Sequence, residues 1–208
     1  MNPYLNELQP YPFEKLRKLF DDINYSGNEA LINLSIGEPK SPTPKVIQEA
    51  LAEHTAELAY YPKTQGMTEL RQAIATWLSQ RFSLDPKSIN PEHNVLPVNG
   101  TREALFAIAQ SLVDNSKADA QVMLPNPFYQ IYEGAAILAG AKPCYLDFSV
   151  VDGQVPALDD VSEESWHKTQ LLYLCTPGNP TGEVLPQSVL LKLIDLAHRY
   201  DFVIVSDE

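Results

Sequence analysis

Hydrophobic positions along the second half of the chain follow two alternating patterns. Short, nearly continuous apolar runs are typical of strands buried on both faces, and they are separated by segments whose apolar residues recur at helical spacing. The predicted strands are 95–98, 121–124, 143–148, 170–175 and 202–205. The predicted helices are 102–113, 128–139 and one that begins at Pro186 and turns Leu190, Leu193, Ile194 and Ala197 inward. This alternation predicts an α/β fold, a three-layer α/β/α arrangement around a mostly parallel sheet.

The pattern is different over residues 1–94. Three prolines favour an extended amino-terminal arm over residues 1–30, with a short helix at 13–20, before a brief apolar strand at 31–36. Thr43-Pro44 predicts a helix start with Thr43 as the N-cap, and a second helix is predicted over 68–82. We expect residues 1–40 to form the arm and a segment of a small domain, and residues 41–208 to form a large domain truncated at its carboxyl end.

Composition excludes several classes of function. The 208 residues are 44% hydrophobic, enough for a sizeable core, and carry a formal charge of −12 from 15 basic and 27 acidic residues. This charge argues against nucleic acid and anionic membranes as partners. Cys144 and Cys175 form no CxxC pair, and the histidines are too dispersed for a metal site. Because no signal peptide precedes Pro3 and no run approaches roughly 18 apolar residues, we expect a soluble cytoplasmic protein.

Polar turns follow two of the predicted strands, at the sheet edge where parallel α/β folds bind ligands. In Asn99-Gly100-Thr101-Arg102, a helix start offers backbone N–H groups and a hydroxyl to an anion, although a simple N-cap by Asn99 or Thr101 is an equal alternative. Pro125-Asn126-Pro127-Phe128-Tyr129 presents aromatic rings that could stack on a flat ligand or simply pack the next helix.

Two further polar groups follow the last two strands. Asn179, between Gly178 and Pro180, could donate to a phenolate-like oxygen or a carboxylate, or form an ordinary tight turn. Asp207 could pair with a protonated ring nitrogen or cap a helix. Together the four turns offer an anion site, an aromatic ring, an oxygen donor and a partner for a ring nitrogen. Those are the groups that pyridoxal 5′-phosphate requires.

The motifs resemble those of one family, the class I/II, fold-type I aminotransferases. They are Gly37-Glu38-Pro39, Tyr61-Pro62-x-x-x-Gly66-x-x-Glu69-Leu70-Arg71, Gly100-Thr101-Arg102-Glu103-Ala104, Pro125-x-Pro127-Phe128-Tyr129, Asn179-Pro180-Thr181-Gly182 and Ser206-Asp207-Glu208. Further phrases are similar to the N-succinyldiaminopimelate aminotransferases of bacterial lysine biosynthesis: residues 1–5, 8–13, 34–40, 98–106 and 125–132.

The resemblance implies a role for each candidate residue. Gly100, Thr101 and Arg102 would hold the cofactor phosphate, chiefly by backbone N–H groups, although Arg102 departs from the small or amide residue commoner in the family. Tyr129 would stack on the ring, Asn179 would bond O3′ and the substrate carboxylate, and Asp207 would pair with the pyridine nitrogen. Gly37 would offer backbone to the substrate carboxylate. Tyr61 would reach the phosphate in the neighbouring subunit, which implies a homodimer with shared sites.

The implied reaction is transamination of N-succinyl-LL-2,6-diaminopimelate with 2-oxoglutarate. Alternatives are another amino donor or C–S lysis on the same fold, or a non-catalytic aminotransferase-like module. The family's Schiff-base lysine follows the Asp-Glu strand, and no lysine here matches it; Lys192, the last, is expected on a helix facing solvent. We therefore predict that residues 41–208 form a truncated pyridoxal-phosphate-binding domain, and that this chain alone is inactive.

Overall fold

The computed structural model describes residues 1–23, 27, 32, 37 and 39–208. Contacts between residues divide the chain into two compact units. The first unit, here called the sheet unit, comprises residues 1–11 and 98–208, and the second, the helical unit, comprises residues 12–97. These units do not coincide with the predicted domains, 1–40 and 41–208. Those bounds refer to the domains of a complete enzyme, and they stay a prediction.

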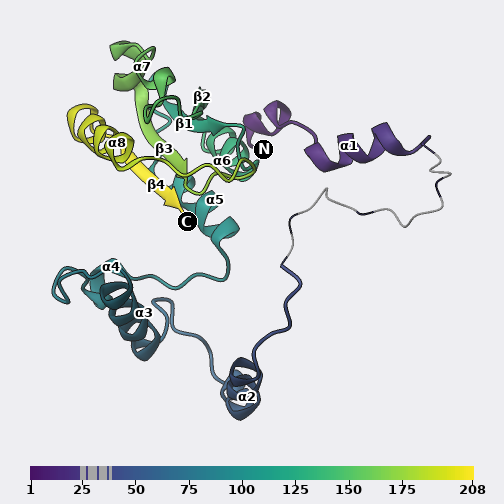
Figure 1. The fold of residues 1–208 in the computed structure, drawn as a ribbon, viewed down its shortest axis with the longest axis vertical. Helices are drawn as coiled ribbons and strands as arrows, with labels where there is room; N and C mark the ends of the chain where they lie inside the picture. Colours follow the sequence, from purple (N-terminus) through teal and green to yellow (C-terminus); the bar gives the residue numbers. More distant parts are fainter. Residues whose placement is uncertain (24–26, 28–31, 33–36, 38) are drawn as a thin grey trace. The chain divides into compact units, whose positions relative to one another are not determined.

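Four parallel strands form the centre of the sheet unit (Figure 1). Their order across the sheet is β2-β1-β3-β4, and their bounds are β1 Gln121–Asn126, β2 Lys142–Asp147, β3 Thr169–Cys175 and β4 Val203–Asp207. Each β1–β2, β1–β3 and β3–β4 pair is parallel. All four carboxyl ends therefore lie at one edge, and the register places Cys175 beside Asp207. The predicted parallel α/β sheet is confirmed.

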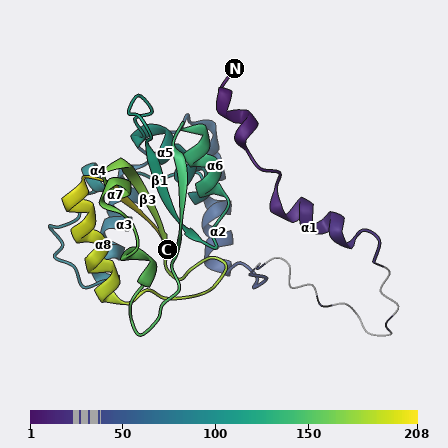
Figure 2. The same ribbon diagram turned by 90° about the horizontal axis from the view of Figure 1, so that it is seen from above.

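Helices cover both faces of this sheet, as Figure 2 shows with α6 and α8 on opposite sides of the strands. On one face α5 (Thr101–Leu112) and α6 (Ile131–Leu138) pack on Val122, Leu124, Leu171 and Tyr173. On the other face α7 (Glu163–Lys168) and α8 (Gln187–Tyr200) pack on Met123, Leu172 and Leu174. Alternate residues of β1 and β3 thus enter different cores, as side chains of a strand must, and the result is three layers.

The amino-terminal segment of the sheet unit packs against the end of α6. It forms a short 3₁₀ helix, η1 (Pro3–Glu7), and Asn2 Nδ2 donates to the carbonyl of Leu138 over 3.2 Å. Gly140 follows α6 with φ +82°, a left-handed conformation typical of a glycine after a helix, and an added Cβ would lie 2.9 Å from the Tyr4 ring. Glycine is therefore required at this position for both conformation and space.

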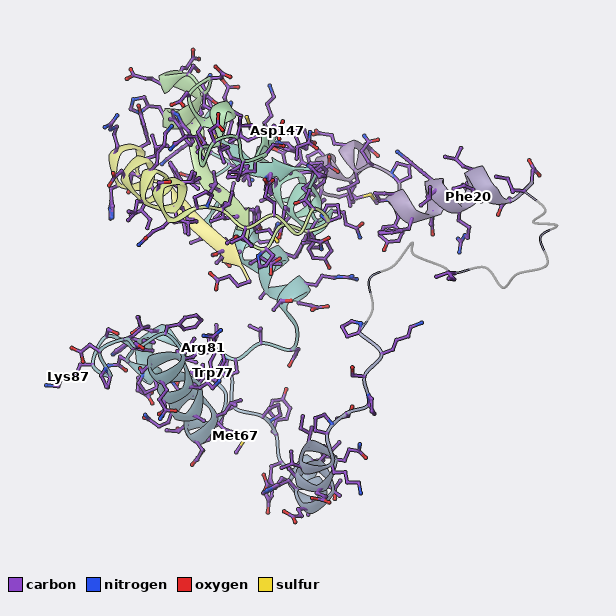
Figure 3. The ribbon with its side chains drawn as sticks, viewed as in Figure 1. Phe20, Met67, Trp77, Arg81, Lys87 and Asp147 are labelled. Carbon is purple, nitrogen blue, oxygen red and sulfur yellow. The ribbon has the colours of Figure 1, made fainter. Side chains whose placement is uncertain are left out.

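The sheet unit also contains the short 3₁₀ helix η3 (Pro156–Leu158), and the other regular elements of the described residues belong to the helical unit. These are α1 (Pro12–Phe20), α2 (Lys45–Glu53), η2 (Thr55–Ala59), α3 (Thr68–Arg81) and α4 (Pro91–Asn94). Arg71 joins α3 to α4, because its Nη2 lies 3.0 Å from Glu92 Oε2 and its Nη1 donates to the carbonyl of Pro91. Large apolar side chains of this unit are exposed, including Met67 and Trp77 (Figure 3). The predicted helices at 13–20 and 68–82 are confirmed.

The predicted strand at 95–98 is wrong. These residues are irregular, and Leu96 and Val98 are 66% and 51% exposed. Pro97 lacks the N–H that a strand interior donates, and none of the described strands pairs with this segment. The preceding residues instead form the short helix α4, capped by Asn90. The predicted strand at 31–36 falls on residues that, apart from Ile32, lie outside the described chain.

Smaller differences concern helix ends and faces. The α2 helix begins at Lys45 with Pro44 as N-cap and no side-chain cap, so the prediction of Thr43 as cap is wrong. Instead the Thr43 carbonyl accepts a hydrogen bond from Gln48 Nε2 over 2.7 Å. On α8, Ile194 is 45% exposed rather than inward, since Val189 and Leu193 occupy the core-facing side. Within the described residues we find no helix long and apolar enough to cross a membrane.

Candidate functional site

A cavity of about 370 Å³ lies between the start of α5 and the end of β4. Its lining includes Thr101 from the first turn of α5 and Asp207 from the last position of β4. The remaining lining residues are Ala104, Leu105, Ile108, Val205, Ser206 and Glu208. The anion turn and the carboxylate predicted from the sequence therefore line one cavity at the carboxyl edge of the sheet.

The start of α5 keeps its backbone donors free of a side-chain cap. Gly100 is the N-cap residue and no side chain caps the helix there, so the alternative of a simple cap by Asn99 or Thr101 is not observed. The first intrahelical bond runs from Ala104 N to Gly100 O over 3.2 Å, and the N–H groups before it belong to the first turn. These donors and the helix dipole suit an anion.

Gly100 provides space rather than an unusual conformation. Its φ of 176° is extended backbone that any residue adopts, but an added Cβ would lie 2.5 Å from Glu103 Oε2. A carboxylate oxygen of the chain itself thus lies against this helix start.

Arg102 and Tyr129 are joined directly. The Arg102 Nε donates to Tyr129 Oη over 2.7 Å, and the guanidinium carbon lies 5.8 Å from the centre of the tyrosine ring. This hydrogen bond raises the pKa of Arg102, which stays charged in any case. Because the guanidinium is engaged with Tyr129, it ties the first turn of α5 to the turn before α6. The backbone N–H of Arg102, rather than its Nε, suits a phosphate.

Asp207 has a buried partner that the sequence reasoning missed. Tyr132 Oη donates to Asp207 Oδ2 over 2.6 Å. The Tyr132 ring is fully buried, stacks on Tyr173 with centroids 4.6 Å apart, and meets Tyr129 edge-on at 5.7 Å. Burial, and then the bond to Asp207, raises the pKa of Tyr132 far above its usual value, so the hydroxyl remains a donor. The sequence held one signal for a role of Tyr132 in the site: it follows Tyr129 by three residues at a helix start, a spacing at which side chains of a helix are neighbours.

Asn179 lies in a tight turn and lines a neighbouring hollow. Gly178 N donates to Glu183 O over 2.8 Å and Gly182 N donates to Gly178 O over 2.6 Å, so the backbone reverses around Asn179. The exposed Asn179 lines this hollow with Asn126 and Cys175. The structure thus contains the turn that sequence reasoning gave as the alternative, and the role of the Asn179 amide toward a cofactor stays a prediction.

Gly37 and Tyr61 belong to the helical unit. Both are exposed, and Tyr61 is 97% exposed. Glu38, between the motif residues Gly37 and Pro39, lies outside the described chain. The roles inferred for Gly37 in substrate binding and for Tyr61 in a neighbouring subunit therefore stay predictions.

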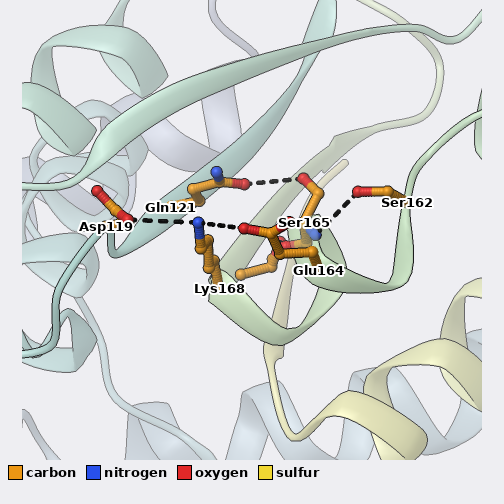
Figure 4. Close-up of polar contacts among 7 residues, drawn as sticks. Asp119, Gln121, Ser162, Glu164, Ser165 and Lys168 are labelled. Carbon is orange, nitrogen blue, oxygen red and sulfur yellow. Dashed lines mark hydrogen bonds and ion pairs between the residues drawn. The ribbon is translucent and has the colours of Figure 1, made fainter.

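Lysines of the sheet unit lie away from the carboxyl edge. Lys142 begins β2, and Lys168, just before β3, lies 2.8 Å from Glu164 and 3.3 Å from Asp119 (Figure 4). Lys192 is on α8, where it is partly exposed and 2.6 Å from Asp159. The fourth, Lys117, precedes β1. All residues from 98 to 208 are described, and none of the lysines among them lies at the edge that carries Thr101 and Asp207.

Known proteins match this chain over most of its length. Residues 29–208 match the model of the family described as aminotransferase class I and II. The LL-diaminopimelate aminotransferase of Moorella thermoacetica is 28% identical over 205 residues, which is 98% of this chain and 51% of that protein. The chain therefore spans about half the length of the curated relatives it matches.

Solved structures give the same result. An aminotransferase from Neisseria meningitidis superposes with a TM-score of 0.92 at 40% identity, covering 100% of this chain and 52% of that one. The N-succinyldiaminopimelate aminotransferase of Mycobacterium tuberculosis superposes with a TM-score of 0.73 at 28% identity, covering 84% and 44%. Both likenesses cover about half of the solved chain or less.

Proposed function

Because the chain belongs to the class I and II aminotransferases, a family of enzymes that depend on pyridoxal phosphate, we propose that it forms the amino-terminal half of such an enzyme. The complete enzyme transfers an amino group from an amino acid to a 2-oxo acid. One observation carries this proposal. Thr101 at a helix start and Asp207 at a strand end line a single cavity and offer complementary chemistry to an anion and to a protonated nitrogen.

The described residues fit the cofactor at both of its polar ends. The first-turn N–H groups of α5, which no side chain caps, bind the phosphate. Asp207 holds a proton on the pyridine nitrogen. When bound, the cofactor supplies a ring that withdraws electrons from the α-carbon of the amino acid. A positive charge on that nitrogen strengthens the withdrawal, so the carboxylate of Asp207 serves catalysis as well as binding.

Two other residues shape the site around the ring. Tyr129, held by Arg102 through a 2.7 Å hydrogen bond, covers one face of the ring and excludes water from it. Asn179 donates its amide to the O3′ of the cofactor and to the substrate carboxylate. From the resemblance to the family we propose that the nucleophilic lysine lies outside this chain. The lysines of the sheet unit lie away from the carboxyl edge, which supports this proposal.

For the substrate we propose N-succinyl-LL-2,6-diaminopimelate, with 2-oxoglutarate as amino acceptor. Support comes from the relatives, whose names include LL-diaminopimelate and N-succinyldiaminopimelate aminotransferases and so share a diaminopimelate skeleton. Related aminotransferases change substrate through few residues, so the free and the succinylated compounds have to be compared directly. We further propose a cytoplasmic homodimer in which the exposed Tyr61 reaches the partner's phosphate site.

The experiment begins with the reading frame beyond Glu208. A Ser-x-x-Lys sequence in a further strand is expected there for an enzyme, and its absence would favour a non-catalytic module. The complete polypeptide is then assayed for glutamate formation from 2-oxoglutarate with LL-diaminopimelate and with its N-succinyl derivative. A higher kcat/KM for the succinylated compound supports the proposed substrate, and a higher value for the free one overturns it. Absence of activity with both compounds would overturn the proposal of a diaminopimelate aminotransferase.

A further inference from the structure

Tyr132 is a buried hydroxyl that bonds the carboxylate of Asp207 and has no role in the function proposed above. Its Oη donates to Oδ2 over 2.6 Å, across 75 positions of sequence. We propose that Tyr132 is a positioning residue that holds Asp207 by one oxygen, so that the other oxygen is left for the ring nitrogen of the cofactor. This inference rests on the proposed function, because that nitrogen belongs to the proposed cofactor.

The Tyr132 side chain is fixed well enough to serve this purpose. Its ring stacks on Tyr173 with an angle of 12° between the planes, and Tyr129 closes another side edge-on at 84°. Tyr173 is itself held, since its Oη donates to the carbonyl of Leu105 over 2.5 Å. A buried hydroxyl without an acceptor is unfavourable, so the Tyr132 O–H stays directed at Asp207.

Asp207 needs such a partner because only its backbone is fixed by the sheet. It is the last residue of β4, paired in register with Cys175 of β3, and its side chain is half-buried at the edge of the cavity. Rotation about its side-chain bonds would otherwise let the carboxylate turn to solvent. The bond from Tyr132 occupies Oδ2 and restricts that rotation, which reduces the ordering required when a cofactor binds.

The alternative is that Asp207 merely satisfies a buried tyrosine. Binding of two cofactors to the complete polypeptide that contains this chain separates the two explanations. One is pyridoxal phosphate, and the other is its 1-deaza analogue, in which C–H replaces the ring nitrogen. Dissociation constants are measured by fluorescence for the wild type, for Tyr132→Phe and for Tyr173→Phe. Tyr173→Phe is the matched control. It also removes a hydroxyl from this pair of stacked tyrosines, but that hydroxyl bonds the carbonyl of Leu105 and not Asp207.

We expect Tyr132→Phe to weaken the binding of pyridoxal phosphate by up to about tenfold, the upper range of the cost of ordering one freed side chain, and to leave the binding of the 1-deaza analogue nearly unchanged. Tyr173→Phe should alter both affinities by the same factor. Equal weakening of both ligands by Tyr132→Phe, or no weakening, would overturn the positioning role. If the wild type itself does not prefer pyridoxal phosphate, the pairing of Asp207 with the ring nitrogen fails, and the positioning role fails with it.

A crystal structure of Tyr132→Phe supplies a readout that needs no cofactor. The Asp207 carboxylate is expected to rotate from its wild-type position, whereas the backbone of β4 stays in place. An unmoved carboxylate would show that the strand end alone sets its orientation, and would overturn the inference even if the affinity changed.

Discussion

Replacement of Asp207 tests the proposed site most directly, and the structure predicts two separable effects. Asp207→Ala removes the carboxylate proposed for the ring nitrogen and also the oxygen that accepts the 2.6 Å hydrogen bond from the buried Tyr132 hydroxyl. A charge-assisted hydrogen bond is worth about 1.5–3 kcal/mol, and a buried hydroxyl left without an acceptor costs about 1–3 kcal/mol. The alanine variant should therefore bind cofactor more weakly and also unfold more easily.

Asp207→Asn separates these effects. Its amide oxygen still accepts from Tyr132, so the free energy of unfolding should stay close to wild type, but the negative charge is gone. Catalysis should fall by about 10²–10³-fold, as when a preorganised electrostatic group is removed, because the charge is needed most as the α-carbon loses its proton. Substrate affinity should change much less.

The assay compares kcat, KM and thermal unfolding of the wild type and both variants in the complete polypeptide, at saturating cofactor. The expected result is a large fall in kcat for both variants, with a clear loss of thermal stability for alanine only. Near-wild-type turnover of Asp207→Asn would refute the pairing with the ring nitrogen. Equal destabilisation by both variants would refute the energetic part of the reasoning, because asparagine retains an acceptor for Tyr132.

Three further predictions concern other residues and the chain as a whole. Gly100→Ala should lower cofactor affinity in a titration. The melting temperature should stay nearly unchanged, because the flexible Glu103 side chain can move away from the added Cβ; a large loss of stability would contradict this. Gly140→Ala should destabilise the chain by about 1–3 kcal/mol in urea, because φ is +82° there and the Cβ would meet Tyr4; an unchanged midpoint would contradict it. The 208-residue chain alone should show no transamination and no borohydride-trapped cofactor on a lysine, and a specific lysine adduct would contradict this. It should also self-associate in light scattering, because many large apolar side chains are exposed.

The sheet could be predicted from the sequence because each strand is defined by its own residues. Continuous apolar runs such as 121–124 and 170–175 must be buried on both faces, and the structure places them in neighbouring parallel strands. Residues 95–98 are as apolar as these runs, but a strand also requires a neighbour and an N–H at Pro97. Apolar character therefore predicted burial, and pairing partners decided which segments became strands.

The candidate site could be predicted only where position along a strand determines position in space. Asp207 meets this condition, because it is the last residue of β4 at the carboxyl edge of the sheet. Thr101 lines the same cavity from the first turn of α5, although the strand predicted before it at 95–98 is not formed. Tyr132 was missed because its bond to Asp207 joins α6 to β4, and sequence spacing does not show which hydroxyl reaches which strand end. Asn179 was placed on the correct loop, but its side-chain surroundings depend on how that loop turns.

The two edges of the sheet differ in chemistry, and the difference supports the prediction that this chain alone is inactive. At the amino edge Lys168 is bound to Glu164 and Asp119, and the adjoining Ser165 donates to Gln121 over 2.9 Å, so these groups fasten α7 to the strand starts (Figure 4). The carboxyl edge has instead a helix start, an aspartate and tyrosines, which bind and orient but supply no amine. The lysines of the sheet unit precede or begin strands, or lie on α7 and α8, away from the carboxyl edge, so we expect a nucleophilic lysine beside Asp207 to come from another segment. The chain thus carries the groups that would bind the cofactor, and we assign the covalent step to sequence outside it.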